Sequence, residues 1–359
     1  MKNTTKNTQP ASFRNLYAFA KKLPIDLSLS ENPLGCSPKV AMVLNRLTQA
    51  DFFDYPDPDC KQLKRVISDR FQIKAEDIFV ANGSEAIIKL LPQVLLGPGD
   101  EVIIPSLTFP LFEIASKMSG AKVIFSEMTQ SLDINLADIQ SKISKKTKLI
   151  FLCNPNNPTG RVIPKKTILD FVKSTKVHVI VDEANIEFGG ETLIKDTSSL
   201  ANLIVIRTFS KGFGLAGLRV GFCAANKELV QQLQKVGQPF PVSTVAEKAA
   251  IAAFADTKFI DKSKKFMQQE RNFLSRELRK RGFAVVESEA NNLLVVIPIF
   301  LPDLVSKLNE KGVSVVDGLS FNVNNAKFIR VSPRLRAINR QFIAVIDQLL
   351  KEQGKQTAV

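Results

Sequence analysis

The feature that most constrains the fold of this chain is a series of short apolar runs that alternate with helical patterns. Seven runs occupy residues 77–83, 100–105, 122–127, 148–155, 177–184, 203–210 and 220–226. Runs this continuous are typical of parallel strands buried on both faces of a sheet. Helical patterns lie between several of them, over residues 84–96, 108–118 and 164–174. The alternation predicts an α/β fold with a mostly parallel, seven-stranded sheet between helices.

The pattern changes beyond about residue 255. A long charged helix is expected over residues 259–281, followed by apolar runs at 283–288, 291–298, 313–318 and 327–333 and by a closing helix. This arrangement predicts a smaller α+β domain. The first fifty residues do not match the large sheet, so we expect them to pack with this second domain. The expected division is an N-terminal segment over 1–50, a large domain over 51–255 and a small C-terminal domain over 256–359.

Composition excludes several classes of protein. The longest apolar stretch, residues 293–305, is interrupted by Pro298 and Pro302 and is too short for a membrane helix. The first thirteen residues are polar and lack the apolar core of a signal peptide. We therefore expect a cytoplasmic protein with no membrane partner. The four cysteines are scattered and the single His178 lies in an apolar run, which predicts no metal site and reduced thiols.

The net charge of +14 is compatible with a nucleic acid, an anionic membrane or a small anionic ligand. The basic residues are spread along the chain without an arginine-rich tail, which argues against a nucleic-acid partner. Most of them are expected on solvated helix faces. A small-molecule ligand is the remaining expectation.

Polar residues gather where the predicted strands end, which is where ligands bind in open α/β sheets. Ser84 and Glu85 open a helix directly after Asn82-Gly83, so their backbone N–H groups could hold a phosphate, although the same residues also make an ordinary turn and N-cap. Asp182 ends another strand, either as a helix cap or as the partner of a cation. A glycine-rich loop follows a third strand and carries Thr208, Ser210, Lys211 and Arg219.

One cofactor, pyridoxal 5′-phosphate, uses all of these groups. The Lys211 amine would form a Schiff base with its aldehyde, Asp182 would pair with the pyridine nitrogen, and hydroxyls with an arginine would hold its phosphate. Asn157, in a proline-fixed turn, would donate to the ring oxygen. Phe109 would lie on the ring or belong to the core.

Seven segments in the same order resemble the fold-type I aminotransferases of class I and II, and are most similar to the histidinol-phosphate aminotransferases. The segments are LSENPLGCSPKV, DYPDPDCKQLK, VANGSEAI, CNPNNPTG, VDEANIEF, RTFSKGFGLAGLRVGF and FIRVSPRLRAINRQF. The similarity spans about residues 27–346 and implies a homodimer. It assigns Lys211 as the catalytic lysine and Arg330 to the substrate carboxylate. Tyr55 would reach the phosphate of the neighbouring subunit. The resemblance also implies that Asn32 and Tyr17 contact substrate.

Two positions depart from the family pattern. Asn185 stands where the family has a tyrosine that contacts the ring oxygen, and an amide there would still donate but change the pKa of the cofactor linkage. Val316 stands where histidinol-phosphate enzymes carry an arginine that meets the substrate phosphate. That change argues against a phosphorylated substrate, unless a different arginine takes over. The candidates for this replacement are Arg14, Arg334 and Arg336.

The leading hypothesis is a transaminase that moves an amino group between an amino acid, or histidinol phosphate, and a 2-oxo acid. An aminotransferase for aromatic or other amino acids without phosphate specificity is one alternative. A lyase resembling threonine-phosphate decarboxylase is another, because the same lysine, aspartate and arginine serve both reactions. A basic binding protein on an inactive scaffold is the non-enzymatic alternative. The presence of Lys211, Asp182 and Arg219 counts against it.

Overall fold

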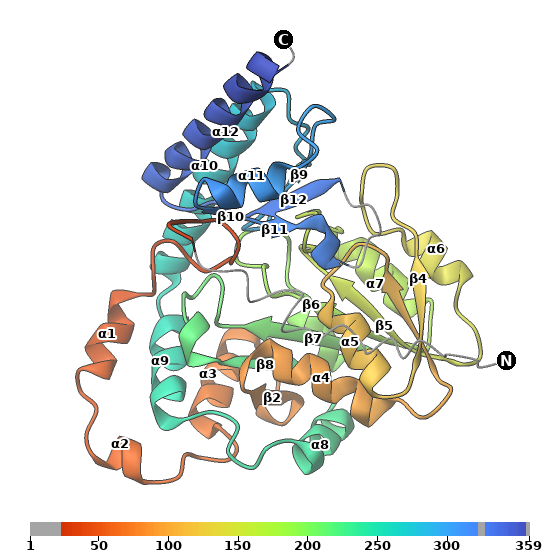
Figure 1. Ribbon diagram of the computed structural model, residues 1–359. Coiled ribbons are helices and arrows are strands. Elements are labelled where there is room, and N and C mark those ends of the chain that lie inside the picture. The colour runs from red at the N-terminus through yellow and green to blue at the C-terminus, as the bar shows by residue number, and fades with distance from the viewer. Residues whose placement is uncertain (1–22, 322–326, 357–359) are drawn as a thin grey trace, which may run out of the picture.

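The computed structural model describes residues 23–321 and 327–356, and its largest element is a seven-stranded sheet (Figure 1). In spatial order the strands are β2 (Ile78–Ala81), β8 (Gly221–Ala224), β7 (Leu203–Thr208), β6 (His178–Asp182), β5 (Thr147–Cys153), β3 (Glu101–Pro105) and β4 (Lys122–Ser126). Neighbours from β7 to β4 pair in parallel, and β8 alone runs antiparallel to both neighbours. The prediction of a mostly parallel seven-stranded sheet is confirmed.

Two strands differ from their predicted form. The parallel direction expected over residues 220–226 is wrong, because β8 follows β7 through a short loop with no crossover helix to return the chain. The strand expected to be buried over residues 122–127 lies at the sheet edge, where β4 pairs with β3 alone and Phe125 is exposed.

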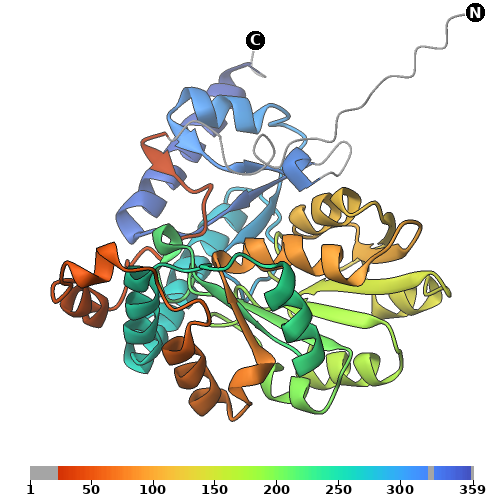
Figure 2. The same cartoon turned by 90° about the horizontal axis from the view of Figure 1, so that it is seen from below.

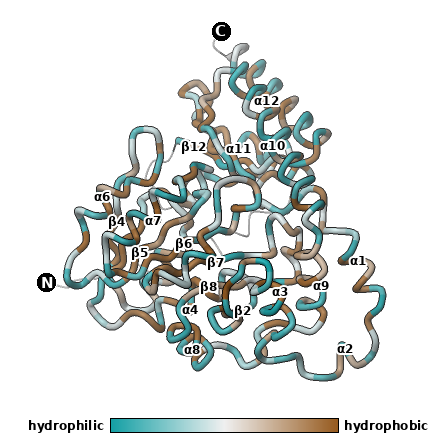
Figure 3. Tube along the Cα trace, turned by 180° about the vertical axis from the view of Figure 1, so that it is seen from behind, coloured by the Kyte–Doolittle hydropathy of each residue, from teal (hydrophilic) through white to brown (hydrophobic). Residues whose placement is uncertain are grey.

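Helices cover both faces of the sheet, as Figure 2 shows. One face packs against α4 (Gly83–Leu95), α5 (Leu111–Met118) and α8 (Lys227–Val236). The other packs against α3 (Lys61–Phe71), α6 (Leu136–Ser141), α7 (Lys165–Lys173) and α9 (Thr244–Phe254). Successive strand residues alternate between the two cores, as Val102 and Ile103 do. This explains the continuous apolar runs, which colour the central strands brown in Figure 3.

The C-terminal part contains a three-stranded antiparallel sheet in the order β11 (Val316–Asp317), β12 (Phe328–Val331) and β9 (Leu293–Val296). Its helices are α10 (Thr257–Arg279), α11 (Leu304–Glu310) and α12 (Arg336–Gln356). The expected strand at 283–288 is wrong, because these residues contribute one isolated bridge, Val285 with Val295. None of the described helices is both long and apolar enough to cross a membrane.

The N-terminal segment is divided between the two parts of the molecule. β1 (Ile25–Asp26) pairs in parallel with β10 (Val313–Ser314) of the C-terminal part. The helices α1 (Pro38–Leu44) and α2 (Ala50–Phe53) lie instead beside α9 of the large sheet (Figure 1). The division of the chain near residues 50 and 255 stays a prediction.

Candidate active site

A cavity of about 320 Å³ lies where β5, β6 and β7 end and α4 begins. Ten of the residues singled out from the sequence line it: Ser84, Glu85, Phe109, Asn157, Asp182, Asn185, Thr208, Ser210, Lys211 and Arg219. Three others, Asn32, Tyr55 and Arg330, do not line it. Tyr17 lies outside the described residues. The fold thus brings together groups that are up to 135 residues apart in the chain, because parallel strands end at the same edge of the sheet.

Lys211 and Asp182 come from adjacent strands. Asp182 is the last residue of β6, and Lys211 follows the end of β7 by three residues. The Asp182 side chain is only 3% exposed, and one of its oxygens accepts the Ala184 N–H at 3.0 Å. Burial raises the pKa of this carboxyl to about 7, although the Ala184 N–H and the Lys211 charge act in the opposite direction. A carboxyl in this position is stabilised in its ionised form by a cationic ligand group.

Close backbone packing shapes the end of the cavity at which α4 begins. Gly83 opens α4 with a φ of +76°, and a Cβ atom there would lie 2.8 Å from the Arg219 guanidinium. A Cβ atom at Gly221 would lie 2.4 Å from the backbone nitrogen of Ser84. Glycine is therefore required where β8 meets the start of α4. The result is a helix N-terminus whose first N–H groups face a pocket lined by Ser84 and Glu85.

Hydroxyl groups and one guanidinium surround this helix N-terminus. The Thr208 hydroxyl donates to Ser210 Oγ at 3.0 Å, and Arg219 Nη1 donates to the same oxygen at 3.4 Å. Arg219 adopts a φ of +52°, and its Nη1 also donates to the carbonyl of Ala216. The Glu85 carboxylate lies 3.7 Å from Arg219 Nη2. Helix N–H groups, hydroxyls and a guanidinium together make a binding site for an anion.

Arg330 lies one hydrogen bond behind the cavity wall. It is buried in β12, and its Nη1 donates to Asn157 Oδ1 at 3.1 Å while its Nη2 donates to the carbonyl of Ser28. Val316 is its partner in the β11–β12 ladder, and the Val316 side chain packs in a buried apolar cluster with Phe321. Arg330 therefore supports the cavity residue Asn157 in this structure.

Asn185 lines the cavity and has a buried polar atom that is unsatisfied. The side chain is 5% exposed, and its Oδ1 has no hydrogen-bond partner among the described residues. A buried polar atom without a partner costs free energy unless a ligand or water meets it. The lining at Asn185 is thus suited to a ligand that bears a polar group.

Asn32 and Tyr55 occupy other surroundings. The Asn32 amide donates to the carbonyl of Gly212 at 2.8 Å and to Ser263 Oγ at 2.9 Å, so it positions the backbone next to Lys211. The Tyr55 side chain is 83% exposed and stacks on Phe240, with the ring centroids 4.6 Å apart. Within one chain, Tyr55 does not line the cavity.

Sequence reasoning missed three polar residues of the cavity, Ser30, Glu31 and Asn292. Glu31 forms an ion pair with Arg334 at 3.0 Å, which brings that arginine to the edge of the site. Asn292 donates to the carbonyl of Pro158 at 2.6 Å. In the sequence, Asn292 stands directly before an apolar run, and this position could have indicated a polar residue at the end of a strand. Two other arginines were candidates for a substrate phosphate: Arg336 is bound by Glu270 at 2.8 Å, and Arg14 lies outside the described residues.

The donor set fits pyridoxal 5′-phosphate. The anion site at the start of α4 matches its phosphate, the buried Asp182 matches its ring nitrogen, and the unsatisfied amide of Asn185 adjoins the same space. Lys211 supplies an amine for its aldehyde. Within residues 23–321 and 327–356, no three His, Cys, Asp or Glu side chains are grouped so as to hold a metal ion.

Comparison with known proteins gives a consistent result. The family described as aminotransferase class I and II matches residues 23–346. A histidinol-phosphate aminotransferase of Methanococcoides burtonii is 35% identical over 335 residues, which cover 93% of this chain and 92% of the relative. The crystal structure of the histidinol-phosphate aminotransferase from Clostridium acetobutylicum superposes with a TM-score of 0.84 at 26% identity, covering 91% of this chain and 99% of that chain. An aspartate aminotransferase of Thermus thermophilus, solved with maleate, shares the fold with a TM-score of 0.82 at 21% identity and 91% coverage of both chains.

Proposed function

Because this chain belongs to the class I and II aminotransferases and is a transaminase that depends on pyridoxal 5′-phosphate, we propose that it transfers the amino group of histidinol phosphate to a 2-oxo acid. The observation that carries the reaction type is the meeting of Lys211 and Asp182 in one cavity beside an anion site. The observation that supports the donor is the similarity to histidinol-phosphate aminotransferases over nine-tenths of the chain.

When bound, pyridoxal 5′-phosphate supplies an electrophilic aldehyde and a ring that withdraws electrons from the amine-bearing carbon of the substrate. Asp182 would hold the ring nitrogen protonated, because the buried carboxylate is stable only beside a cation. The Lys211 amine would take the proton from the amine-bearing carbon of the substrate and deliver it to the cofactor carbon that carried the aldehyde. The helix N-terminus and Arg219 would fix the phosphate, which holds the reacting groups in place.

Arg334 is our candidate for the substrate phosphate. Val316 is buried in an apolar cluster and offers no charge, and Arg336 already donates hydrogen bonds to both oxygens of Glu270. Arg334 is paired with Glu31, which lines the cavity. A phosphate could compete with this single carboxylate for the guanidinium. Arg330, in turn, would bind the carboxylate of the 2-oxo acid by exchanging its contact with Asn157.

Steady-state kinetics with several donors test this substrate. We expect kcat/KM to be higher for histidinol phosphate than for phenylalanine, histidine or glutamate. Arg334→Gln should lower kcat/KM for histidinol phosphate by about tenfold or more and leave glutamate much less affected. Arg340→Gln removes an exposed arginine of α12 as the matched control. If an unphosphorylated amino acid is the best donor, the enzyme is an aminotransferase without phosphate specificity, as Val316 suggests.

We further propose that the enzyme is a homodimer with shared active sites. Four aromatic side chains are exposed on the surface formed by α2, the segment after it and the segment before α9: Phe52, Phe53, Tyr55 and Phe240. Exposed aromatic groups of this size are enriched at protein interfaces. In a dimer Tyr55 would leave solvent and reach the phosphate site of the partner.

A cytoplasmic location is also proposed. All four cysteines are free thiols, and three of them, Cys60, Cys153 and Cys223, are buried. Reduced cysteines are typical of proteins that work in the cytosol. The activity named for the relatives, which acts on a small metabolite, is compatible with that compartment.

A further inference from the structure

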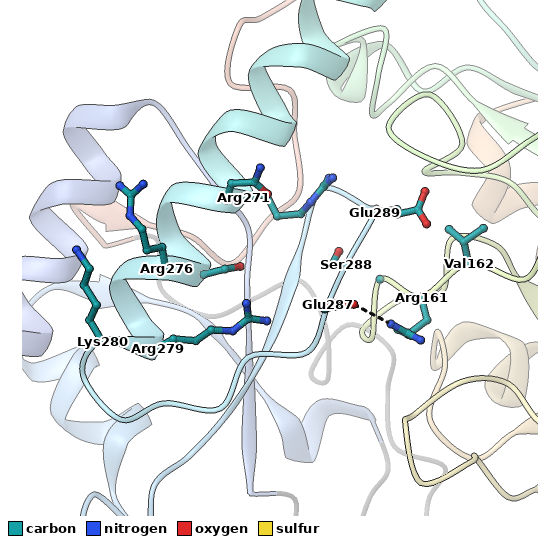
Figure 4. A pocket seen from close by; sticks show the side chains of 12 residues that line it. Arg161, Val162, Arg271, Arg276, Arg279, Lys280, Glu287, Ser288 and Glu289 are labelled. Carbon is teal, nitrogen blue, oxygen red and sulfur yellow. Dashed lines mark ion pairs between the residues drawn. The ribbon is translucent and has the colours of Figure 1, made fainter.

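A second cavity of about 690 Å³ lies apart from the catalytic one (Figure 4). One wall is the C-terminal half of α10, and the opposite wall consists of residues 160–162 and 287–289. No residue lines both cavities. The second cavity is therefore separate from the catalytic one in its lining.

Positive charge dominates the lining of this cavity. Five basic side chains face two acidic ones, and the basic ones are Arg161, Arg271, Arg276, Arg279 and Lys280. Figure 4 shows the last four along one helical wall, with Arg161 on the other side beside Glu287. Asp133 binds Arg161 through two hydrogen bonds of 2.6 and 3.2 Å. Because Asp133 balances the charge of Arg161, the excess positive charge of the cavity lies on the α10 wall.

Two arginines of this wall have no carboxylate partner. Arg271 is 8% exposed and donates to the carbonyl of Ala290 at 2.7 Å, and Arg279 donates to the carbonyl of Val285 at 2.9 Å. Neither has a carboxylate within 4.0 Å among residues 23–321 and 327–356. By contrast Arg281, just beyond this helix, is held by Asp347 at 2.6 and 2.8 Å. Glu289 of the opposite wall acts on the charge of the buried Arg271 without forming an ion pair, so an anionic ligand would give this guanidinium a direct partner.

The two remaining cations of the wall share one acid. Arg276 and Lys280 contact the same Glu277 oxygen at 3.2 and 3.3 Å, and Arg281 contacts the other oxygen at 3.0 Å. Glu277 and Asp347 therefore balance three cations at the end of α10, of which Arg276 and Lys280 line the cavity. A single anionic group would leave this wall positively charged, whereas a ligand with several negative charges would not.

We propose that this cavity binds a small molecule that carries two or more linked phosphate groups. Guanidinium groups match phosphate oxygens with paired hydrogen bonds, and this wall presents them from successive turns of one helix. The cavity volume exceeds that of the catalytic cavity, so it has room for a ligand larger than a single phosphate. The inference depends on the charge and shape of this cavity and not on the identity of the amino donor.

Calorimetric titration of the cofactor-loaded enzyme with inorganic pyrophosphate tests the proposal, with orthophosphate as the comparison ligand. Loading the cofactor first keeps the catalytic phosphate site filled. We expect one pyrophosphate per chain, bound at least about tenfold more tightly than orthophosphate. The double variant Arg276→Gln/Arg279→Gln should weaken pyrophosphate binding about tenfold or more, and Arg340→Gln should change it less than about twofold. Transaminase activity of the double variant should stay unchanged.

Three results would overturn the proposal: no pyrophosphate binding at millimolar concentration, equal affinity for both ligands, or full binding by the double variant. If the double variant is unstable, Arg276→Gln alone provides the test, because its side chain is exposed and, within the part of the chain that the structure describes, forms an ion pair with Glu277 alone. That variant should still weaken pyrophosphate binding severalfold. Unchanged binding by a folded Arg276→Gln protein, together with unchanged binding by Arg279→Lys, would likewise contradict the site.

Discussion

Replacing Asp182 by asparagine should stabilise the cofactor-free protein at alkaline pH. The Asp182 carboxyl is buried at the end of β6, and burial raises its pKa from 3.8 to about 7. Because the folded-state pKa lies above the unfolded-state value, the folded protein binds more protons between these two values. Its free energy of unfolding therefore falls as the pH rises through that window, and stays level above about pH 7.

The size of the effect follows from the pKa difference. One pKa unit corresponds to about 1.4 kcal/mol, so the ionised carboxylate costs the cofactor-free protein roughly 4 kcal/mol at about pH 8. At about pH 5 the cost is roughly 1–2 kcal/mol, because the folded-state carboxyl is then protonated. Asp182→Asn removes the pH-dependent part of this cost. We expect its stabilisation relative to wild type to be larger at about pH 8 than at about pH 5 by roughly 2–3 kcal/mol.

Urea unfolding of both cofactor-free proteins at the two pH values measures this difference. Asp133→Asn is the matched control, because Arg161 lowers the pKa of Asp133 and its loss should destabilise the protein similarly at both values. The same Asp182→Asn variant should bind pyridoxal 5′-phosphate about a hundredfold more weakly, since a buried ion pair is lost. An Asp182→Asn protein that is no more stable relative to wild type at pH 8 than at pH 5 would refute the reasoning.

Three further predictions concern other residues of the site. Borohydride reduction followed by peptide mass mapping should place the cofactor on Lys211, and Lys211→Ala should carry no covalent cofactor; an adduct on a different lysine would exclude this assignment. Arg330→Ala should lower kcat/KM for amino-acid donors by an amount equivalent to roughly 2–5 kcal/mol of transition-state stabilisation, with partial recovery in Arg330→Lys. Histidinol phosphate has no carboxylate, so its kcat/KM should fall less. Equal losses for both kinds of donor would contradict the assignment. Mixing Tyr55→Phe chains with Lys211→Ala chains should restore about one normal site per heterodimer; a fully active monomer at micromolar concentration would contradict the shared site.

The sheet could be predicted from sequence because its central strands are buried on both faces. Residues such as Val102 and Ile103 point to opposite cores, so each strand appears as an unbroken apolar run. The direction of β8 could not be predicted in this way, because an antiparallel strand in the same position is also buried on both faces. Residues 283–288 have the composition of a strand, but among the described residues they form a single β-bridge, between Val285 and Val295.

Most of the cavity residues predicted from the sequence lie at the ends of strands or in the segments that follow them, as Asp182 and Lys211 do. Those it missed depend on contacts between distant segments. Glu31 enters the cavity edge with Arg334, 303 residues further along the chain. The role of Asn32 beside Gly212 is of the same kind. Spacing within one segment carries no information on such contacts, so tertiary packing decides them.

We propose that this cavity performs transamination of histidinol phosphate through Lys211. The most direct test adds one donor at a time to the cofactor-loaded enzyme, without a 2-oxo acid, and follows the cofactor absorbance and the product. We expect histidinol phosphate to convert the cofactor to its aminated form in a one-to-one ratio, faster than glutamate, histidine or phenylalanine, and a 2-oxo acid to reverse the change. Release of carbon dioxide from an amino acid with no lasting change in the cofactor would contradict this proposal and identify a decarboxylase.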